Sequence, residues 1–173
     1  VGRDQMAVFI ARAMCGGDAS VPAGPETASF DDVPNTGYGS EGTDPYWAYD
    51  YVEYAVANGI TSGYDDELYH PDWDVTRGQM AAFIARAMCG GEAYVPDPTG
   101  EPQFPDVTDT ENSWCYKHVE YIAGEEVTLG YPDGNYYPDV PCARDQMAAY
   151  LCRAFDLATP SAPAFAITDY FPL

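Results

Sequence analysis

The stretch that decides the fold is RGQMAAFIARAMCGG, residues 77–91, because the chain uses it three times. Residues 3–17 read RDQMAVFIARAMCGG and residues 144–155 read RDQMAAYLCRAF. Apolar residues recur at i, i+3, i+4, i+7 and i+8, the spacing of one stripe along an amphipathic helix. In the second copy the stripe consists of Met80, Phe83, Ile84, Ala87 and Met88. The repeat therefore predicts three helices, each with one core-facing side.

The sequence also predicts where the repeated helix begins and ends. Thr76 followed three residues later by Gln79 is a capping box, and Gly90-Gly91 is a helix stop. The other two copies have Gly2 and Ala143 in place of the threonine, so we expect weaker caps there.

An arginine opens each copy: Arg3, Arg77 and Arg144. A cation at the first helical position is unfavourable by a few tenths to about 1 kcal/mol, because the helix dipole is positive there. Two explanations remain open. The arginine and the free helix N–H groups could bind a carboxylate or phosphate, or the arginine could pair with one of the many acidic side chains.

The composition limits the class of protein. The 173 residues include 28 acidic and 7 basic side chains, giving a net charge of −21. Nucleic acid is excluded as a partner because clusters of Lys and Arg are absent. The acidity indicates either a solvated, self-repelling surface or association with divalent cations. No run of about 18 apolar residues exists, so no transmembrane segment is predicted.

Five cysteines favour an oxidising, extracellular environment with one or two disulfides and an odd thiol. No signal peptide is visible. The chain opens inside a repeat, which suggests that upstream sequence was removed or is missing.

The order of segments follows the repeat. We expect half a repeat, two full repeats and a Pro-rich apolar tail, joined by linkers. A first helix at 46–57 should end at Asn58-Gly59. The predicted segments are 1–17 (half repeat), 18–29 (linker), 30–91 (repeat), 92–103 (linker), 104–157 (repeat) and 158–173 (tail).

The two full repeats share one template. Trp47 precedes Arg77 by 30 residues, and Trp114 precedes Arg144 by 30 residues. The first repeat carries seven extra loop residues in the 36–44 region. The matched motifs are Phe30-Asp31-Asp32-Val33 with Phe104-Pro105-Asp106-Val107, Gly63-Tyr64 with Gly130-Tyr131, and Pro71-Asp72 with Pro138-Asp139.

The succession Phe-x-Asp-Val, Trp, Gly-Tyr-x-Asp-Gly-x-Tyr-x-Pro and Thr-Arg-x-Gln-Met-Ala resembles the S-layer homology (SLH) repeat. The resemblance implies a mainly α fold of helical hairpins with long turn-rich loops in a pseudo-threefold arrangement. It also implies a place at the bacterial cell surface, outside the cell. Grooves between such repeats bind secondary cell-wall polysaccharide, often through a pyruvylated sugar.

The family motif Thr-Arg-Ala-Glu lies at the start of the second helix of a repeat. Here the arginine is kept in all three copies, and the resemblance implies that it meets the anionic group of the glycan. The glutamate of the motif is glutamine in every copy, which keeps the capping role but loses a charge.

Trp47 and Trp114 are further candidates, because a groove tryptophan lies near the ligand in the family. A tryptophan at the start of an amphipathic helix is also a core anchor, and we expect mainly that role. The glycan-binding candidates are Arg3, Arg77, Arg144, Trp47, Trp114, Gly63, Tyr64, Gly130 and Tyr131.

Catalysis has little support in the sequence. His70 and His118 occupy non-equivalent positions, and no nucleophile-elbow, zinc-protease or Walker motif occurs. Asp133-Gly134 is a turn signal without the ligand spacing of a calcium loop. We expect no enzyme, no cofactor and no metal site.

A disulfide is predicted from the helical hairpin. If the two helices of the last repeat run antiparallel, Cys115 near the start of one approaches Cys152 near the end of the other. Cys15, Cys89 and Cys142 could bridge between repeats or chains.

Two functions are compatible with these features. The first is a structural protein that assembles with itself, head to tail, into a filament or surface layer, because the half repeat should expose an apolar stripe that a neighbour could cover. The alternative is an anchor that tethers a larger protein to the wall polysaccharide. The assembly surface would comprise Met6, Phe9, Ile10, Phe165, Ile167, Tyr170 and Phe171.

Overall fold

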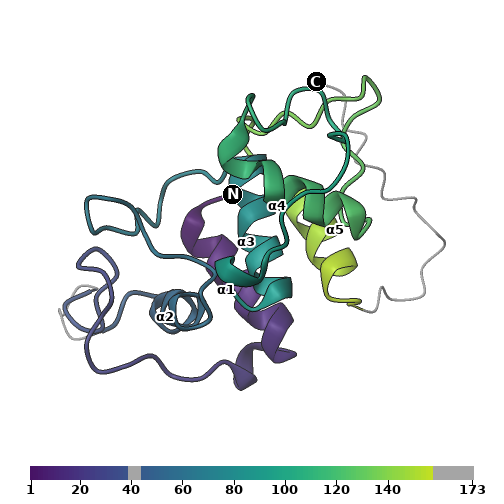
Figure 1. Ribbon diagram of the computed structural model, residues 1–173. Helices are drawn as coiled ribbons and strands as arrows, with labels where there is room; N and C mark the ends of the chain where they lie inside the picture. The colour runs from purple at the N-terminus through teal and green to yellow at the C-terminus, as the bar shows by residue number, and fades with distance from the viewer. Residues whose placement is uncertain (39–43, 158–173) are drawn as a thin grey trace. The chain divides into compact units, whose positions relative to one another are not determined.

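The computed structural model describes residues 1–38 and 44–157. In these residues the regular structure consists of five α-helices, two short 3-10 helices and isolated bridges instead of strands (Figure 1). The mainly α fold expected from the sequence is therefore confirmed. The helices are α1 (Arg3–Cys15), η1 (Asp18–Ser20), α2 (Tyr49–Ala57), α3 (Arg77–Cys89), η2 (Glu92–Tyr94), α4 (Ser113–Gly124) and α5 (Arg144–Ala154).

The three repeated helices are α1, α3 and α5, and each begins at its arginine as predicted. The capping box of α3 is formed: the Gln79 N–H donates to Thr76 Oγ1 (3.3 Å) and the Thr76 N–H donates to Gln79 Oε1 (3.1 Å). At α5 only the second half remains, because Ala143 has no hydroxyl. Gly90 ends α3 in the left-handed conformation, with φ 81°.

The chain divides into two compact units, Val1–Val75 and Thr76–Leu173. Each unit begins with a repeated helix and continues with a 3-10 turn, a long loop and the first helix of the next sequence repeat. The compact units are thus out of phase with the sequence repeats 30–91 and 104–157. This offset brings the arginine of one repeat into the same unit as the Gly-Tyr turn of the next. The pseudo-threefold arrangement stays a prediction.

In the first unit α1 packs against α2, which is seen end-on in Figure 1. The expectation that the stripe of α1 is exposed is wrong, because α2 covers it. Met6 and Ile10 are fully buried, and Phe9 is half-buried. Met6 and Ile10 are therefore not available to a neighbouring subunit. The tail candidates Phe165, Ile167, Tyr170 and Phe171 lie outside the described residues.

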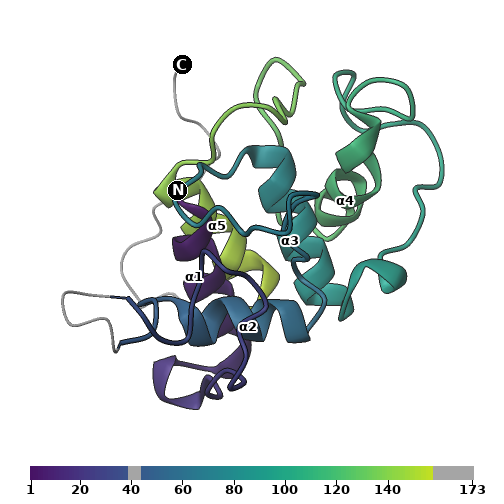
Figure 2. The same ribbon diagram turned by 90° about the vertical axis from the view of Figure 1, so that its left-hand side faces the viewer.

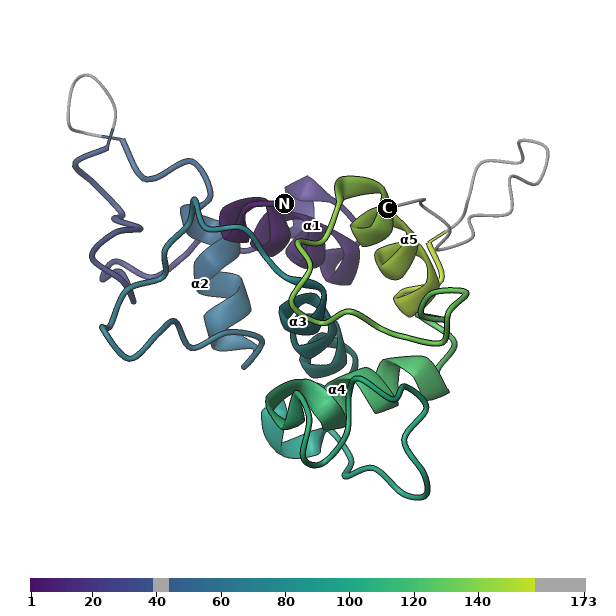
Figure 3. The ribbon, with the colours of Figure 1, turned by 90° about the horizontal axis from the view of Figure 1, so that it is seen from above.

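In the second unit α3 packs against both α4 and α5, as Figures 2 and 3 show. Its core includes the fully buried side chains of Met80, Ile84 and Ile122, with Met147 from α5 almost as deep. The main partner of α4 is α3 and not α5. The hairpin packing assumed for the last repeat is therefore not the dominant contact.

Cys115 and Cys152 do not form the predicted disulfide in the structure. The geometric reason is that α4 packs against α3 instead of α5. Cys115 Sγ instead donates to the Asn112 carbonyl (3.3 Å). Burial raises the pKa of the Cys115 thiol to about 12, so this residue is an inert core side chain.

The segments expected as linkers are held to the helices by acidic side chains. Glu53 of α2 accepts hydrogen bonds from the N–H (2.7 Å) and hydroxyl (2.6 Å) of Ser29. Glu120 of α4 accepts the equivalent bond from the Gln103 N–H (2.9 Å). Each carboxylate fixes the point at which the linker joins the following motif. The first helix of the earlier repeat starts at Tyr49, three residues later than expected.

Candidate functional site: two arginine–tyrosine boxes

Arg77, the first residue of α3, lies in a box of tyrosine side chains. Its guanidinium carbon is 4.7 Å from the ring centre of Tyr131, 4.5 Å from that of Tyr136 and 5.8 Å from that of Tyr150. Arg77 Nε donates to the Tyr136 carbonyl (2.8 Å), and the Tyr136 hydroxyl donates back to the Arg77 carbonyl (2.9 Å). This reciprocal pair fixes the arginine relative to the return loop.

The Arg77 side chain is fully buried, with 0% of its surface exposed. Its two Nη atoms have no hydrogen-bond partner among the described residues, and no carboxylate of the described chain pairs with it. For Arg77 the carboxylate pairing considered from the sequence is therefore not found. A buried guanidinium without a counter-charge carries a desolvation penalty that an anion would offset.

Arg3, the first residue of α1, lies in an equivalent box in the first unit. Its guanidinium carbon is 4.6 Å from the Tyr64 ring centre and 4.5 Å from that of Tyr69. Arg3 Nε donates to the Tyr69 carbonyl (2.7 Å), and the Tyr69 hydroxyl donates to the Arg3 carbonyl (2.7 Å). Thr61 Oγ1 lies 3.5 Å from Arg3 Nη2. The two boxes therefore have the same reciprocal hydrogen bonds between the arginine and a tyrosine.

The helix-start N–H groups are already occupied in both boxes. The N–H of Arg3 donates to the Trp73 carbonyl (3.0 Å), and the N–H of Arg77 donates to the Val140 carbonyl (2.9 Å). The next N–H in each helix bonds to a proline carbonyl, Pro71 or Pro138. The sequence-based picture of free backbone donors beside the arginine is wrong at these two helices. Any anion site there is built from the guanidinium.

The Gly-Tyr turns are positioned by the Phe-x-Asp-Val motifs. Gly63 and Gly130 have φ of 74° and 68°, and a Cβ on either would lie 2.4 Å from Cε1 of Phe30 or Phe104. These glycines are required by the turn and the adjacent phenylalanine ring.

The motif aspartates hold the segment that follows each turn, in which His70 and Tyr137 have positive φ (55° and 58°). Asp106 accepts hydrogen bonds from the N–H groups of Tyr136 (2.9 Å) and Tyr137 (2.7 Å), and Asp32 does the same for Tyr69 and His70. A carboxylate that accepts two backbone N–H groups fixes the carbonyl that the arginine then binds. The aspartate recurs in both Phe-x-Asp-Val motifs, but its role in binding backbone N–H groups was not predicted from the sequence.

The two candidate tryptophans are half-exposed, so the expectation of mainly core packing is wrong. Trp47 is 52% exposed and Trp114 is 50% exposed. The Trp114 indole lies on Gly78, the residue after Arg77, where a Cβ would approach Trp114 Cη2 to 2.7 Å. In the first unit, Tyr46 beside Trp47 donates to Asp4 (2.8 Å), the residue after Arg3. Each tryptophan thus stands close to the start of an arginine helix.

The third arginine, Arg144 at the start of α5, is exposed. The neighbouring Gln146, which replaces the family glutamate, is buried and donates to the Tyr131 hydroxyl (2.9 Å). This residue therefore helps to hold a wall of the Arg77 box. The structure brings Arg3 and Arg77 together with the tyrosines of the Gly-Tyr turns, Tyr64 and Tyr131.

Glu92 of η2 forms a charged cluster at the other end of α3. It accepts hydrogen bonds from Arg86 (2.5 Å), Lys117 (2.5 Å) and His118 (2.9 Å). Partial burial raises the pKa of Glu92, but hydrogen bonds from Lys117, His118 and Arg86 outweigh it and lower the pKa to about 2. Asp18 has the same position in the first unit, bonded to Arg12 and Tyr51. These acids were not predicted from the sequence; Asp18 joins α1 to α2, and Glu92 joins α3 to α4.

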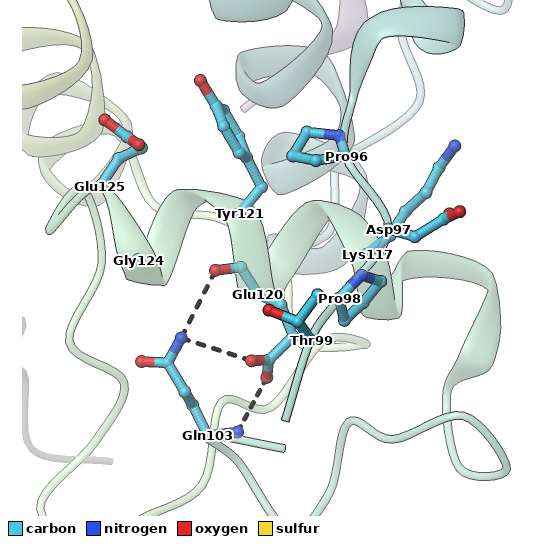
Figure 4. Close-up of a pocket in the computed structure, with 10 residues that line it drawn as sticks. All are labelled: Pro96, Asp97, Pro98, Thr99, Gln103, Lys117, Glu120, Tyr121, Gly124 and Glu125. Carbon is cyan, nitrogen blue, oxygen red and sulfur yellow. Dashed lines mark hydrogen bonds between the residues drawn. The ribbon is translucent and has the colours of Figure 1, made fainter. Parts of the chain in front are cut away.

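A groove lies between the linker and the outer side of α4 (Figure 4). Its volume is about 430 Å³, and its walls include Pro96, Pro98 and Tyr121. An equivalent groove in the first unit has about 170 Å³. In Figure 4 the dashed bonds join Gln103 to Glu120, the latch that holds the linker over the helix. Among the described residues, the walls of both grooves contain none of the three repeated arginines, so neither groove is part of an arginine box.

Two kinds of feature are absent from the described residues, 1–38 and 44–157. No group of three or more His, Cys, Asp or Glu side chains is arranged to hold a metal ion. No helix in that part of the chain is long and apolar enough to cross a membrane.

In each box, the arginine at the start of one repeated helix contacts tyrosines of the next sequence repeat. This arrangement defines a tandem helical-repeat protein. The S-layer homology domain model matches residues 29–81 and 103–148, which is more than half of the chain. The chain therefore belongs to the S-layer homology domain family, as its resemblance indicated.

Three relatives show the setting in which such repeats occur. The chain is 26% identical over 129 residues to cell surface glycoprotein 1 of Acetivibrio thermocellus, covering 69% of this chain and 6% of that protein. It is 27% identical over 129 residues to an S-layer protein of Bacillus licheniformis, covering 75% and 13%. It is 29% identical over 86 residues to a cellulosome-anchoring protein of A. thermocellus, covering 50% and 19%.

These relatives place the chain among proteins of the bacterial cell surface. The chain spans between 6% and 19% of their lengths. The similarity is thus to a repeat module that occurs both in surface-layer proteins and in anchoring proteins.

Proposed function

We propose that the chain is a non-catalytic module of the bacterial cell surface that binds an anionic wall polysaccharide at the Arg3 and Arg77 boxes. The observation that carries this proposal is the buried guanidinium of Arg77, whose two Nη atoms lack partners among the described residues. Family membership supplies the chemical class of the ligand.

The geometry favours a compact acidic substituent such as a carboxylate or a phosphate. A guanidinium presents two parallel N–H donors that match the two oxygens of such a group. The tyrosine rings exclude water from the arginine and so strengthen the charge interaction. Because Arg77 is fully covered in the structure, binding requires the side chains around it to move.

The test is a set of arginine variants measured against purified wall polysaccharide. Arg3→Met and Arg77→Met remove the two guanidinium groups, and Arg12→Met removes the same charge from an exposed pair with Asp18. We expect the double box variant to lose at least about tenfold in affinity relative to Arg12→Met, since lost charge-assisted bonds are worth about 1.5–3 kcal/mol. Circular dichroism should confirm that each variant is folded. Equal binding by the double variant and Arg12→Met would exclude the boxes as the binding site.

Assembly into a filament or surface layer is a second candidate. It is favoured by the match of 75% of the chain to an S-layer protein. The burial of Met6 and Ile10 removes the α1 stripe as its basis. The apolar residues Phe165, Ile167, Tyr170 and Phe171 remain as the sequence feature that could support it.

A further inference from the structure

Three aromatic side chains follow one another outward from Arg3. The Tyr64 ring, which lies against the Arg3 guanidinium at 4.6 Å, is 5.2 Å from the Trp73 ring and edge-on to it. The His70 ring is stacked on Trp73, with ring centres 3.8 Å apart and planes 8° apart. The series therefore connects a buried guanidinium to the half-exposed Trp73.

Trp73 presents a large aromatic surface in this position. Its side chain is 51% exposed although His70 covers one ring face. Its backbone is fixed on both sides, since its carbonyl accepts the Arg3 N–H (3.0 Å) and its N–H donates to the His70 carbonyl (3.1 Å). The indole ring itself is held by its contacts with His70 and Tyr64. His70 is itself held by Asp66 (2.7 Å). An exposed ring that is held in place loses little conformational entropy when a ligand stacks on it.

The second unit has the same frame without the tryptophan. Tyr131 and Tyr137 form an edge-on pair at 5.3 Å, which corresponds to Tyr64 and His70 at 5.4 Å. Val140 supplies the carbonyl that accepts the Arg77 N–H, the role that Trp73 has for Arg3. The indole is thus an addition to the first box that its frame does not need.

We propose that Trp73, backed by His70, is a stacking subsite for a neutral pyranose next to the Arg3 box. This inference rests on the proposed glycan binding, and it predicts that the two boxes differ in the number of sugar units that they bind. The C–H face of a pyranose is apolar and slightly positive, and it packs well on the negative face of an indole. The first unit then recognises an acidic sugar and its neutral neighbour, whereas the second recognises the acidic sugar.

The experiment uses two probes with the full chain. One is a pyruvylated hexose as its methyl glycoside, and the other is a disaccharide that links this sugar to a neutral hexosamine. The chain has three tryptophans, so a ¹⁵N correlation spectrum shows three indole signals, which Trp→Phe variants assign. We expect the disaccharide, and not the monosaccharide, to shift the Trp73 signal.

The matched variants exchange the differing residues of the two units. Trp73→Val gives the first box the residue of the second, and we expect about a tenfold loss in affinity for the disaccharide with unchanged affinity for the monosaccharide. Val140→Trp should strengthen disaccharide binding by the second unit. An unshifted Trp73 signal on saturation, or unchanged disaccharide affinity in Trp73→Val, overturns the stacking subsite.

Failure of the proposed function gives a different result. If neither probe binds, or if Arg3→Met and Arg77→Met leave monosaccharide binding unchanged, the boxes are not glycan sites and the subsite falls with them. If the monosaccharide binds through the arginines, but the disaccharide neither shifts the Trp73 signal nor loses affinity in Trp73→Val, only the subsite is excluded.

Discussion

Glu92 connects α3 and α4 through a single carboxylate. It bonds to Arg86 of α3 and to Lys117 and His118 of α4, so one carboxylate joins two helices. Burial lowers the pKa of His118, against the opposing effect of its hydrogen bond to Glu92. With Nε2 donating to Glu92, the buried Nδ1 has no hydrogen-bond partner in the described part of the chain. The neutral imidazole is therefore the form that the fold favours.

The stability of the second unit should fall as the pH is lowered. The folded-state pKa of His118 lies below 6.5, so its contribution is lost on acidification below that value. The folded-state pKa of Glu92 is about 2 against 4.5 for the free side chain, so its contribution is present above pH 4.5 and is lost towards pH 2. Both groups act in the same direction. We expect Glu92→Gln to lose about 1 kcal/mol at pH 7, less than the full shift implies because the carboxylate is 46% exposed and screened.

Urea unfolding followed by circular dichroism at pH 7 and pH 3 measures this effect. The difference between wild type and Glu92→Gln should shrink at pH 3. Glu101→Gln, at an exposed position, is the control and should match wild type at both values. A constant difference across this pH range would show that the carboxylate acts through packing instead of charge.

At the residue scale, the sequence could identify residues that recur in each repeat and that stand at positions where general helix rules disfavour them. The arginines were recognisable because a cation at a helix start is unfavourable. Their actual partners, the Tyr69 and Tyr136 carbonyls, could not be assigned because they depend on a tertiary fold across repeats. Trp73 gave no signal, since it has no counterpart in the second repeat.

The Gly-Tyr turns of the two units differ in the residue four positions after the glycine. Gly134 has φ 89°, and the equivalent Glu67 has φ 65°. A side chain with a Cβ is strained in this left-handed region, by about 1 kcal/mol. Glu67 is exposed and makes its turn bond through its backbone N–H to the Tyr64 carbonyl (3.0 Å). The side chain therefore contributes no packing that offsets the strain.

Replacing Glu67 by glycine should stabilise the first unit. We expect a gain of about 0.5 kcal/mol, because relief of the strain exceeds the extra backbone entropy of glycine in the unfolded chain. The reciprocal change Gly134→Glu should destabilise the second unit by a similar amount or more. Thermal unfolding of the two variants and wild type compares them directly. A lower midpoint for Glu67→Gly would mean that the glutamate makes a favourable contact in solution.

At the scale of elements, periodicity predicted the repeated helices well because the apolar spacing and the caps are local. The pairing of helices was not predictable in the same way. A repeat in the sequence suggested a hairpin inside each repeat, but the apolar stripe of α1 is covered by α2 and α3 packs chiefly against α4. A stripe shows that a helix needs a partner and does not identify that partner.

For the whole molecule, the dominant physical property is a net charge of −21 on 173 residues. Copies of such a chain repel one another over a distance set by the salt, about 30 Å at 0.01 M and about 8 Å at 0.15 M. Any assembly driven by apolar contacts must overcome this repulsion. With Met6 and Ile10 of the α1 stripe buried, the apolar residues of 158–173 remain as the other part of the assembly surface expected from the sequence.

Salt should therefore control assembly. We expect the full chain to be monodisperse in 0.01 M salt and to associate as salt or millimolar divalent cation is added, because screening leaves the apolar attraction unopposed. A chain ending at residue 157 should stay monodisperse throughout. Light scattering and negative-stain microscopy of both chains measure this. Association of the shortened chain would assign assembly to the described surface instead, and a full chain that stays monodisperse at all salt concentrations would leave wall anchoring as the function that the arginine boxes support.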